Sequence, residues 1–516
     1  MRGQLYDLIA CAAIAVRSLV ALWGFSGYNS PPMHGDFEAH RHWMEITTNI
    51  PIGDWYRNTR DNDLLYWGLD YPPLMAYFSW LCGQVARVAY PQLVELFESR
   101  GLESAEAKSF MRRTVLIGDC VLLVPAVYYL FSLKSKRGHD NSVGVALLKL
   151  LCLMTPCLIL IDHGHFQYNG MCIAFALIGA GLVVQERDVL GSVFFCFSLN
   201  TKQMALYYAP VFFFALLRKC YQQPAWSAKF SKLAVIGLTV LATFAVLWVP
   251  FCLWPSAEET CLSSLGHVLS RQFPFSRGIF EDKVANIWYA LSVVVDYRHF
   301  IALPQLVSLS LVLTLTLLGP VCYLLISYPL SLSHILLGLV NSSLAFFLAS
   351  FQVHEKSLLL TLVPASFLAE GDADLCTWLQ MLGAFAMYPL LKRDGLSVPY
   401  LALCIAYCAL SAEFRQASRR VAVDSSIVLA PWQDKPMQFV HSVLRVFQAV
   451  SYIGMVLLSI GEVFLPPPPR YPDLYPALFA LFGAANLCAM YVLGVAWQYK
   501  AALCAVPDAG RKSKTS

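Results

Sequence analysis

LPQLVSLSLVLTLTLLGPVCYLLIS, residues 303–327, contains no charged side chain. An α-helix rises about 1.5 Å per residue, so about 20 apolar residues cross the hydrocarbon core of a bilayer, which is about 30 Å thick. The run KLAVIGLTVLATFAVLWVPFCL, residues 232–253, is equally apolar after its first lysine. These two stretches predict membrane-spanning helices, and they decide the fold class.

The composition of the whole chain agrees with this prediction. Of its 516 residues, 58% are hydrophobic and 14% are charged, and the mean hydropathy is +0.57. Soluble proteins carry about 25% charged residues. The formal net charge of +4 is spread over hydrophobic runs, which excludes nucleic acid as a partner. The sequence therefore predicts an all-α polytopic membrane protein that lies in the lipid bilayer.

The number of spans follows from the apolar runs. The segment 72–90 is apolar too, but it begins with Pro72-Pro73 and carries Arg87, so we expect it to lie in the membrane interface. The run 189–217 can be one long helix or two broken ones. We expect about 14 spans, within a range of roughly 11–14, at 5–24, 112–133, 144–161, 170–185, 189–199, 204–217, 232–253, 303–327, 332–350, 358–370, 374–391, 396–412, 439–465 and 473–498.

The basic residues predict the orientation of these spans, because cytosolic loops are rich in Lys and Arg. One side collects Arg2, Lys134, Lys136, Arg137, Arg187, Arg218, Lys219, Arg415, Arg419, Arg420, Arg511, Lys512 and Lys514. Both termini are therefore expected in the cytosol, and the long loops 25–111 and 254–302 on the opposite side. We expect a catalytic transmembrane module over 1–365 that includes both loops, followed by C-terminal helices and a basic tail over 366–516.

The 16 cysteines add no second class of site. Most of them lie inside apolar runs, where a thiol packs as a small hydrophobic group. No CxxC pair occurs, so we expect neither a zinc site nor a framework of disulfides.

Under this topology the unusual polar clusters all fall on the side of the long loops. They are His34–Trp43, Tyr66–Pro73, Asp162–Asn169, Asn200–Gln203, Arg271–Arg277 with Phe280–Lys283, and Gln352–Lys356. Ionisable groups at membrane depth are costly, so their clustering indicates a functional site. Aromatic residues lie among them, as in sites that bind the apolar face and hydroxylated rim of a sugar. An interfacial aromatic belt explains part of the aromatics but not the carboxylates and histidines.

Some residues in or near these clusters have alternative explanations. Asp36 can serve as a catalytic carboxylate or cap a helix over 37–49. His163 and His165 are one residue apart with no third ligand nearby, which is a weak zinc signal. Asp119, inside an expected span, is best explained as a polar packing contact.

The clusters suggest a transfer reaction on a lipid-linked sugar. The phosphate of a lipid-linked donor would be met by cationic groups: Lys202, which lies in a break between half-helices, and Arg277, His354 and Lys356. Lys356 can alternatively stabilise the end of the preceding helix. A nearby carboxylate would act as general base on the acceptor hydroxyl. No DxD-type motif for a nucleotide sugar stands out, which favours a lipid-phosphate donor.

Six strings in these clusters resemble a known family, with order and spacing kept from about residue 25 to 365. They are GDFEAHRHWMEIT (35–47), LLYWGLDYPP (64–73), DHGHFQYNG (162–170), LNTKQMALYYAP (199–210), FPFSRGIFEDKVANIW (273–288) and FQVHEKS (351–357). The chain is similar here to the dolichyl-phosphate-glucose-dependent α-1,3-glucosyltransferases of asparagine-linked glycosylation. These are GT-C-fold enzymes of the endoplasmic reticulum membrane.

The resemblance implies a function and two sets of residues. The strings at 64–73, 201–208 and 280–288 resemble the branch that adds the first glucose more than its paralogue that adds the second. That implies inverting transfer of glucose from dolichyl β-glucosyl phosphate to Man9GlcNAc2 on dolichyl pyrophosphate, in the lumen, without metal or cofactor. Asp36 matches the family's catalytic base, and His354 to Lys356 match its motif near the donor phosphate.

The remaining candidates for sugar contacts come from the clusters and not from the family. They are Glu38, Arg41, Trp67, Asp70, Tyr71, His163, His165, Gln167, Tyr168, Asn169, Gln203, Glu281 and Asp282. Two alternatives stay open beside the enzyme. A transporter or flippase of lipid-linked sugars would show inverted repeats and ionisable residues near mid-bilayer. A catalytically silent scaffold subunit would not need Asp36 within an intact motif.

Overall fold

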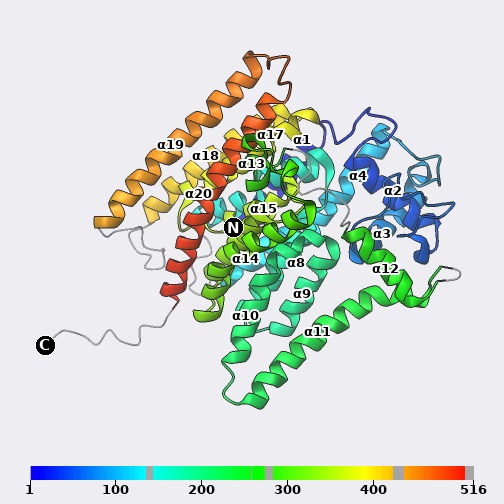
Figure 1. The fold of residues 1–516 in the computed structure, drawn as a ribbon, viewed down its shortest axis with the longest axis horizontal. Coiled ribbons are helices and arrows are strands. Elements are labelled where there is room, and N and C mark those ends of the chain that lie inside the picture. Colours follow the sequence, from blue (N-terminus) through cyan, green and yellow to red (C-terminus); the bar gives the residue numbers. More distant parts are fainter. Residues whose placement is uncertain (1, 135–142, 257–258, 274–282, 422–434, 506–516) are drawn as a thin grey trace.

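The chain is folded into helices joined by short turns and two long loops (Figure 1). The structure is a computed structural model, and it describes residues 2–134, 143–256, 259–273, 283–421 and 435–505. Within these ranges no β-strand is formed. The all-α prediction is confirmed.

Among the described residues, seven helices are apolar and long enough to cross a membrane. One is the continuous segment α4 (Ala105–Gly118), η3 (Asp119–Leu123) and α5 (Val124–Lys134); the others are α11 (Trp226–Leu253), α14 (Leu303–Ser327), α15 (Leu332–Ala349), α18 (Ser397–Val421), α19 (Lys435–Phe464) and α20 (Leu474–Cys504). An eighth span is formed if α6 (Val143–Leu153) is joined to Pro156–Phe166, which bends away from it by 43°.

The other predicted spans coincide with shorter or more polar helices. These are α1 (Arg2–Val20), α8 (Asn169–Val184), α9 (Asp188–Thr201), α10 (Ala209–Tyr221) and α17 (Ala373–Arg393). The run 358–370 holds only α16 (Leu359–Ser366), and its eight residues extend about 12 Å, too short to cross alone. The run 189–217 is broken in two, with Lys202 between α9 and the short 3-10 segment η5 (Gln203–Tyr208).

The first long loop is itself a packed unit. Its main elements are α2 (Asp36–Asn49) and α3 (Pro73–Ala89), which pack against each other. Gly83 makes their close approach feasible, because a Cβ there would lie 2.0 Å from Thr48 Oγ1. The predicted interfacial segment 72–90 is therefore a helix that covers α2 and α9.

The second long loop is tied to the membrane domain by a disulfide. Cys252, at the end of α11, is bonded to Cys261, the first residue of α12 (Cys261–Gln272). The sequence predicted no framework of disulfides, and it did not indicate this single pair, because the two cysteines lie nine residues apart and form no CxxC motif.

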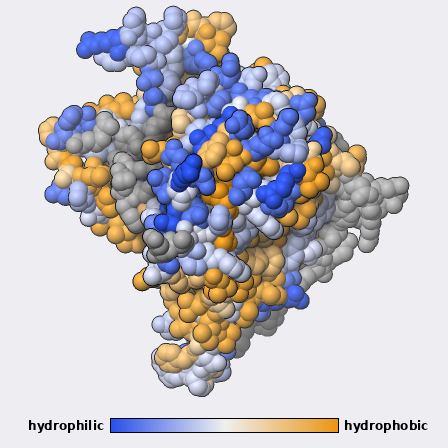
Figure 2. Space-filling model, turned by 90° about the vertical axis from the view of Figure 1, so that its right-hand side faces the viewer, coloured by the Kyte–Doolittle hydropathy of each residue, from blue (hydrophilic) through white to orange (hydrophobic). Residues whose placement is uncertain are grey.

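The helices differ in how much of their surface is covered. α15 lies at the centre, against α14, α16 and α20, and most of it is buried. In contrast, α11 extends away from the body and joins α12 beside the first loop (Figure 1). Figure 2 shows one side of the molecule, where hydrophilic residues gather over the middle and upper parts and hydrophobic residues cover the lower part. The apolar lower part is suited to contact with lipid.

Candidate active site

A cavity of about 1320 Å³ lies where the first loop meets the ends of several helices. Its lining comes from segments as far apart in the chain as Gly24 and Gly395. Pockets for single small molecules measure about 300–1,000 Å³, so this cavity has room for more than one group. It gathers ten of the residues that the sequence predicted: Asp36, Trp67, Asp70, Tyr71, His165, Gln167, Lys202, Gln203, His354 and Lys356.

Helix α2 presents one face to the cavity. Asp36, Ala39, His40 and Trp43 all line it, and their spacing of three to four residues places them on one side of a helix. The helix starts where it does because Gly35 lets residue 26 approach closely: a Cβ at Gly35 would lie 2.5 Å from Ser26 Oγ. That hydroxyl accepts a hydrogen bond from the backbone N–H of Asp36 at 3.2 Å.

Asp36 does not cap this helix with its side chain. It is the first helical residue, and Gly35 holds the capping position. Its Oδ2 accepts from Lys356 Nζ at 2.6 Å and from the Gln167 amide, and it lies 2.9 Å from His165 Nε2. Every side-chain contact that Asp36 makes with the described residues falls on Oδ2. The other oxygen, Oδ1, has no side-chain hydrogen bond or ion pair within the described residues.

The charges around Asp36 keep it ionised. Burial alone would raise the pKa of its carboxyl, but the positive charges of Lys356 and His165 outweigh burial and hold that pKa well below its usual value. Burial would likewise lower the pKa of Lys356, and the Asp36 carboxylate reverses this and raises it. The pair is therefore charged at neutral pH.

Gln167 joins this pair to a second cation. Its Oε1 accepts from Tyr71 Oη at 2.8 Å and from Lys202 Nζ at 3.1 Å. Lys202 also donates to Asn169 Oδ1 at 2.7 Å and lies over the Tyr71 ring, 4.9 Å from its centroid. Two lysine ammonium groups from distant parts of the chain thus flank one wall of the cavity.

Sequence reasoning missed Asp394, which lines the cavity together with Arg393. Asp394 caps the C-terminus of α17 in the three-residue turn before α18, and its Oδ2 lies 2.5 Å from His165 Nδ1. Alternation of the predicted spans puts this turn on the same side as the polar clusters, and that signal could have found it. The cavity therefore extends beyond the predicted catalytic module of 1–365.

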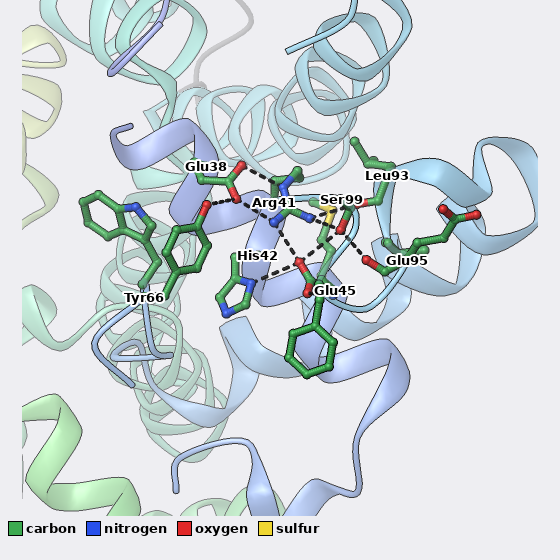
Figure 3. Close-up of polar contacts among 12 residues, drawn as sticks. Glu38, Arg41, His42, Glu45, Tyr66, Leu93, Glu95 and Ser99 are labelled. Carbon is green, nitrogen blue, oxygen red and sulfur yellow. Dashed lines mark hydrogen bonds and ion pairs between the residues drawn. The ribbon is translucent and has the colours of Figure 1, made fainter. Parts of the chain in front are cut away.

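Glu38 and Arg41 lie on the far face of α2, in a buried network and not at the cavity (Figure 3). The Arg41 guanidinium donates to Glu38 Oε2 at 2.7 Å and to Glu45 Oε2 at 2.7 Å. It also reaches the carbonyl of Leu93 and the hydroxyl of Ser99. These bonds tie α2 to the end of the loop, which explains both charged residues without a sugar.

Three other candidates are also buried behind the cavity lining. His163 Nε2 lies 2.9 Å from Asp119 Oδ2, which also accepts from Arg17, so the expectation of a packing contact for Asp119 fits. Tyr168 shares a hydrogen bond with Thr114, and Asn169 donates to Asp162. The predicted residues Arg277, Glu281 and Asp282 lie outside the described residues, as does the basic tail.

The arrangement does not resemble a metal centre. In the described part of the chain no group of three His, Cys, Asp or Glu side chains could hold a metal ion. The two histidines considered for zinc turn to different carboxylates, His163 to Asp119 and His165 to Asp36 and Asp394.

The fold and the cavity together define a multi-pass membrane protein with a carboxylate–lysine site at the ends of its helices, and its class is that of the membrane glycosyltransferases. The chain belongs to the ALG6, ALG8 glycosyltransferase family, whose model matches residues 13–494.

Named relatives align over almost the whole chain. The "Dolichyl pyrophosphate Man9GlcNAc2 alpha-1,3-glucosyltransferase" of Gallus gallus is 42% identical over 484 residues, which cover 92% of each chain. The protein of that name from Mus musculus is 40% identical over 485 residues, 93% of each chain. A "Probable dolichyl pyrophosphate Man9GlcNAc2 alpha-1,3-glucosyltransferase" of Dictyostelium discoideum is 39% identical over 487 residues, covering 92% of this chain and 91% of its own.

Proposed function

We propose that this protein transfers glucose from dolichyl glucosyl phosphate to Man9GlcNAc2 on dolichyl pyrophosphate, in α-1,3 linkage, with Asp36 as general base. The names of the relatives support the acceptor and the linkage. The observation that carries the role of Asp36 is the geometry of its carboxyl at the cavity wall, where Lys356, His165 and Gln167 contact Oδ2 and no described side chain bonds to Oδ1.

The reaction is a single displacement. Asp36 Oδ1 takes the proton of the acceptor hydroxyl as the hydroxyl oxygen bonds to the anomeric carbon of glucose. The bond from that carbon to the phosphate oxygen breaks on the opposite face, and its electron pair leaves with dolichyl phosphate, which inverts the configuration. Dolichyl phosphate is a good leaving group, so fixed cations suffice to stabilise the charge that develops on it.

The cations proposed for the donor phosphate are Lys356 and His354, with Lys202 beside them. Lys356 and His354 come from the segment after α15, and both line the cavity. In this structure Lys356 Nζ rests on Asp36, so the ammonium leaves Oδ2 for the phosphate when the donor enters. The aromatic faces of Trp43, Trp67 and Tyr71, which line the same cavity, are suited to the sugar rings.

We place this site in the lumen of the endoplasmic reticulum, with both termini in the cytosol. The Cys252–Cys261 disulfide supports that orientation, because disulfides persist in oxidising compartments such as this lumen. After reduction, a membrane-impermeant maleimide should label this pair only in opened microsomes. Labelling in sealed microsomes, equal to that in opened ones, would contradict the orientation; a variant with both cysteines replaced by serine gives the background.

The function is tested by transfer in vitro. Purified protein is given a synthetic dolichyl-type glucosyl phosphate and either Man9GlcNAc2 or Glc1Man9GlcNAc2 on a lipid pyrophosphate. We expect product with the first acceptor and at most a trace with the second, because the hydroxyl that receives the first glucose is already occupied there. Product only with the second acceptor would identify the paralogous second-glucose activity. No product with either, but movement of a lipid-linked sugar across vesicles, would identify a flippase.

A further inference from the structure

His165 lies between two carboxylates from distant parts of the chain, Asp36 and Asp394. Its Nε2 lies 2.9 Å from Asp36 Oδ2 and its Nδ1 lies 2.5 Å from Asp394 Oδ2. The His165 and Asp394 side chains are only 2% and 3% exposed, so water does not screen the contact between them. Among the described side chains, His165 is the one that bonds to both carboxylates, so it is the direct link between Asp394 and the base.

The position of His165 is set by its backbone. It lies in η4 (Leu160–Phe166), a π-helical segment, and its carbonyl accepts from the backbone N–H of Ser26 at 2.9 Å. The Arg112 guanidinium donates to the neighbouring carbonyl of Gly164 at 2.6 Å. The backbone is thus held from two other elements, and the ring orientation is left to its two nitrogens.

The two contacts determine the protonation of the ring. A neutral imidazole carries one N–H and can donate to one carboxylate, whereas an imidazolium carries two and can donate to both. The charged groups that face His165 are Asp36 from α2, Lys356 from η7 (Glu355–Leu358), Asp394 from the turn after α17, and Arg112 from α4 through Gly164. From α1, Arg17 is paired with Asp119.

We propose that Asp394 is a positioning residue that holds His165 as an imidazolium, with Nε2–H directed at Oδ2 of the base. Lys356 Nζ lies 3.2 Å from Nε2 and opposes the second proton, so retaining it depends on the negative charges on both sides of the ring, that of Asp36 and that of Asp394. With His165 charged and fixed, Asp36 is held in one rotamer and its Oδ1 is turned toward the cavity. This inference rests on the proposed role of Asp36.

The variant Asp394→Asn separates charge from shape. The amide oxygen can still accept from Nδ1–H, but the negative charge is gone, so His165 should lose its second proton at a lower pH. A neighbouring opposite charge shifts the pKa of a group by about 1–3 units. The midpoint of the alkaline limb of kcat against pH should therefore move to lower pH by about that amount. The pH profile does not depend on how much enzyme folds. Asp61→Asn, the same change at an exposed position of the first loop, is the control and should keep the wild-type profile.

A second measurement tests whether Asp394 acts through His165. We expect Asp394→Asn to lower turnover in the wild-type background and to have no further effect when His165 is already Gln. An unchanged alkaline limb, or the same loss with and without His165, would overturn the inference. These results differ from a failure of the proposed function, in which the unsubstituted protein itself would transfer no glucose.

Discussion

Asp36→Asn should lower turnover by about 10²–10⁴-fold, which is the usual contribution of a general base. The amide keeps the size of the carboxylate and can accept hydrogen bonds from Lys356 and Gln167, but it cannot take the proton of the attacking hydroxyl. Donor and acceptor should therefore still bind. Asp36→Glu should also be poor, because the extra methylene displaces the carboxylate from the line of attack. Both predictions are checked by measuring the initial rate and the donor affinity of each purified variant.

Glu38 is the matched control, since it is also a carboxylate of α2 but lies on the opposite face. Glu38→Gln weakens the bonds to Arg41 and Tyr66, and the loss of one partner of a buried ion pair costs up to about 3–5 kcal/mol of stability. We expect a lower melting temperature with unchanged turnover per folded molecule. Near wild-type turnover in Asp36→Asn beside an inactive Glu38→Gln would assign the base to Glu38 instead.

Lys356→Met should lower turnover by about 10²–10³-fold and raise the KM for the donor, because it removes a cation from the leaving phosphate. A second effect follows from the ion pair with Asp36. Lys356 holds the pKa of that carboxyl down, so without it the pKa rises toward its usual value. The base must be ionised to act, and the acidic limb of kcat against pH should therefore move to higher pH.

Lys134→Met serves as the control for this change. Lys134 is the last residue of α5, and it pairs with Glu370, which is about half exposed. Such surface ion pairs contribute about 0–1 kcal/mol to stability. Its kinetics should match those of the unsubstituted enzyme. If Lys356→Met keeps both the donor KM and the acidic limb, Lys356 has neither role.

The helical class could be predicted because an apolar run long enough to cross a bilayer has little choice of secondary structure. A run such as 303–327 has only one way to satisfy its backbone in lipid, and it forms α14 over Leu303–Ser327. The run 358–370 was harder to assign from its sequence, because its hydropathy is that of a membrane span. In the structure its helix contains Pro364 and ends at Ser366, where a turn follows. Hydropathy reports burial, and a short helix inside the protein is as apolar as one in lipid.

The site could be predicted only in part. The sequence predicted that Asp36, His165 and Lys356 lie on the same side of the membrane. It could not predict that they contact one another, because 320 residues separate Asp36 from Lys356. Asp394 belongs to a turn so short that its single carboxylate forms no cluster. Glu38 and Arg41 were assigned to the sugar because they adjoin Asp36 in sequence. The helical period places them on the other face, with Glu45 one turn beyond Arg41.

The positions of these residues along the chain set the order in which their partners are synthesised. The hydrogen-bond partners of Arg41 among the described residues lie between Glu38 and Ser99, so they are available as soon as the first loop has been synthesised. Lys356 is 320 residues beyond Asp36, which at about 5–20 residues per second means a delay of about 15–65 s, and Asp394 follows later still. The first loop can thus fold around its own charges while the ribosome is still far from Lys356 and Asp394, the groups that complete the surroundings of the proposed base.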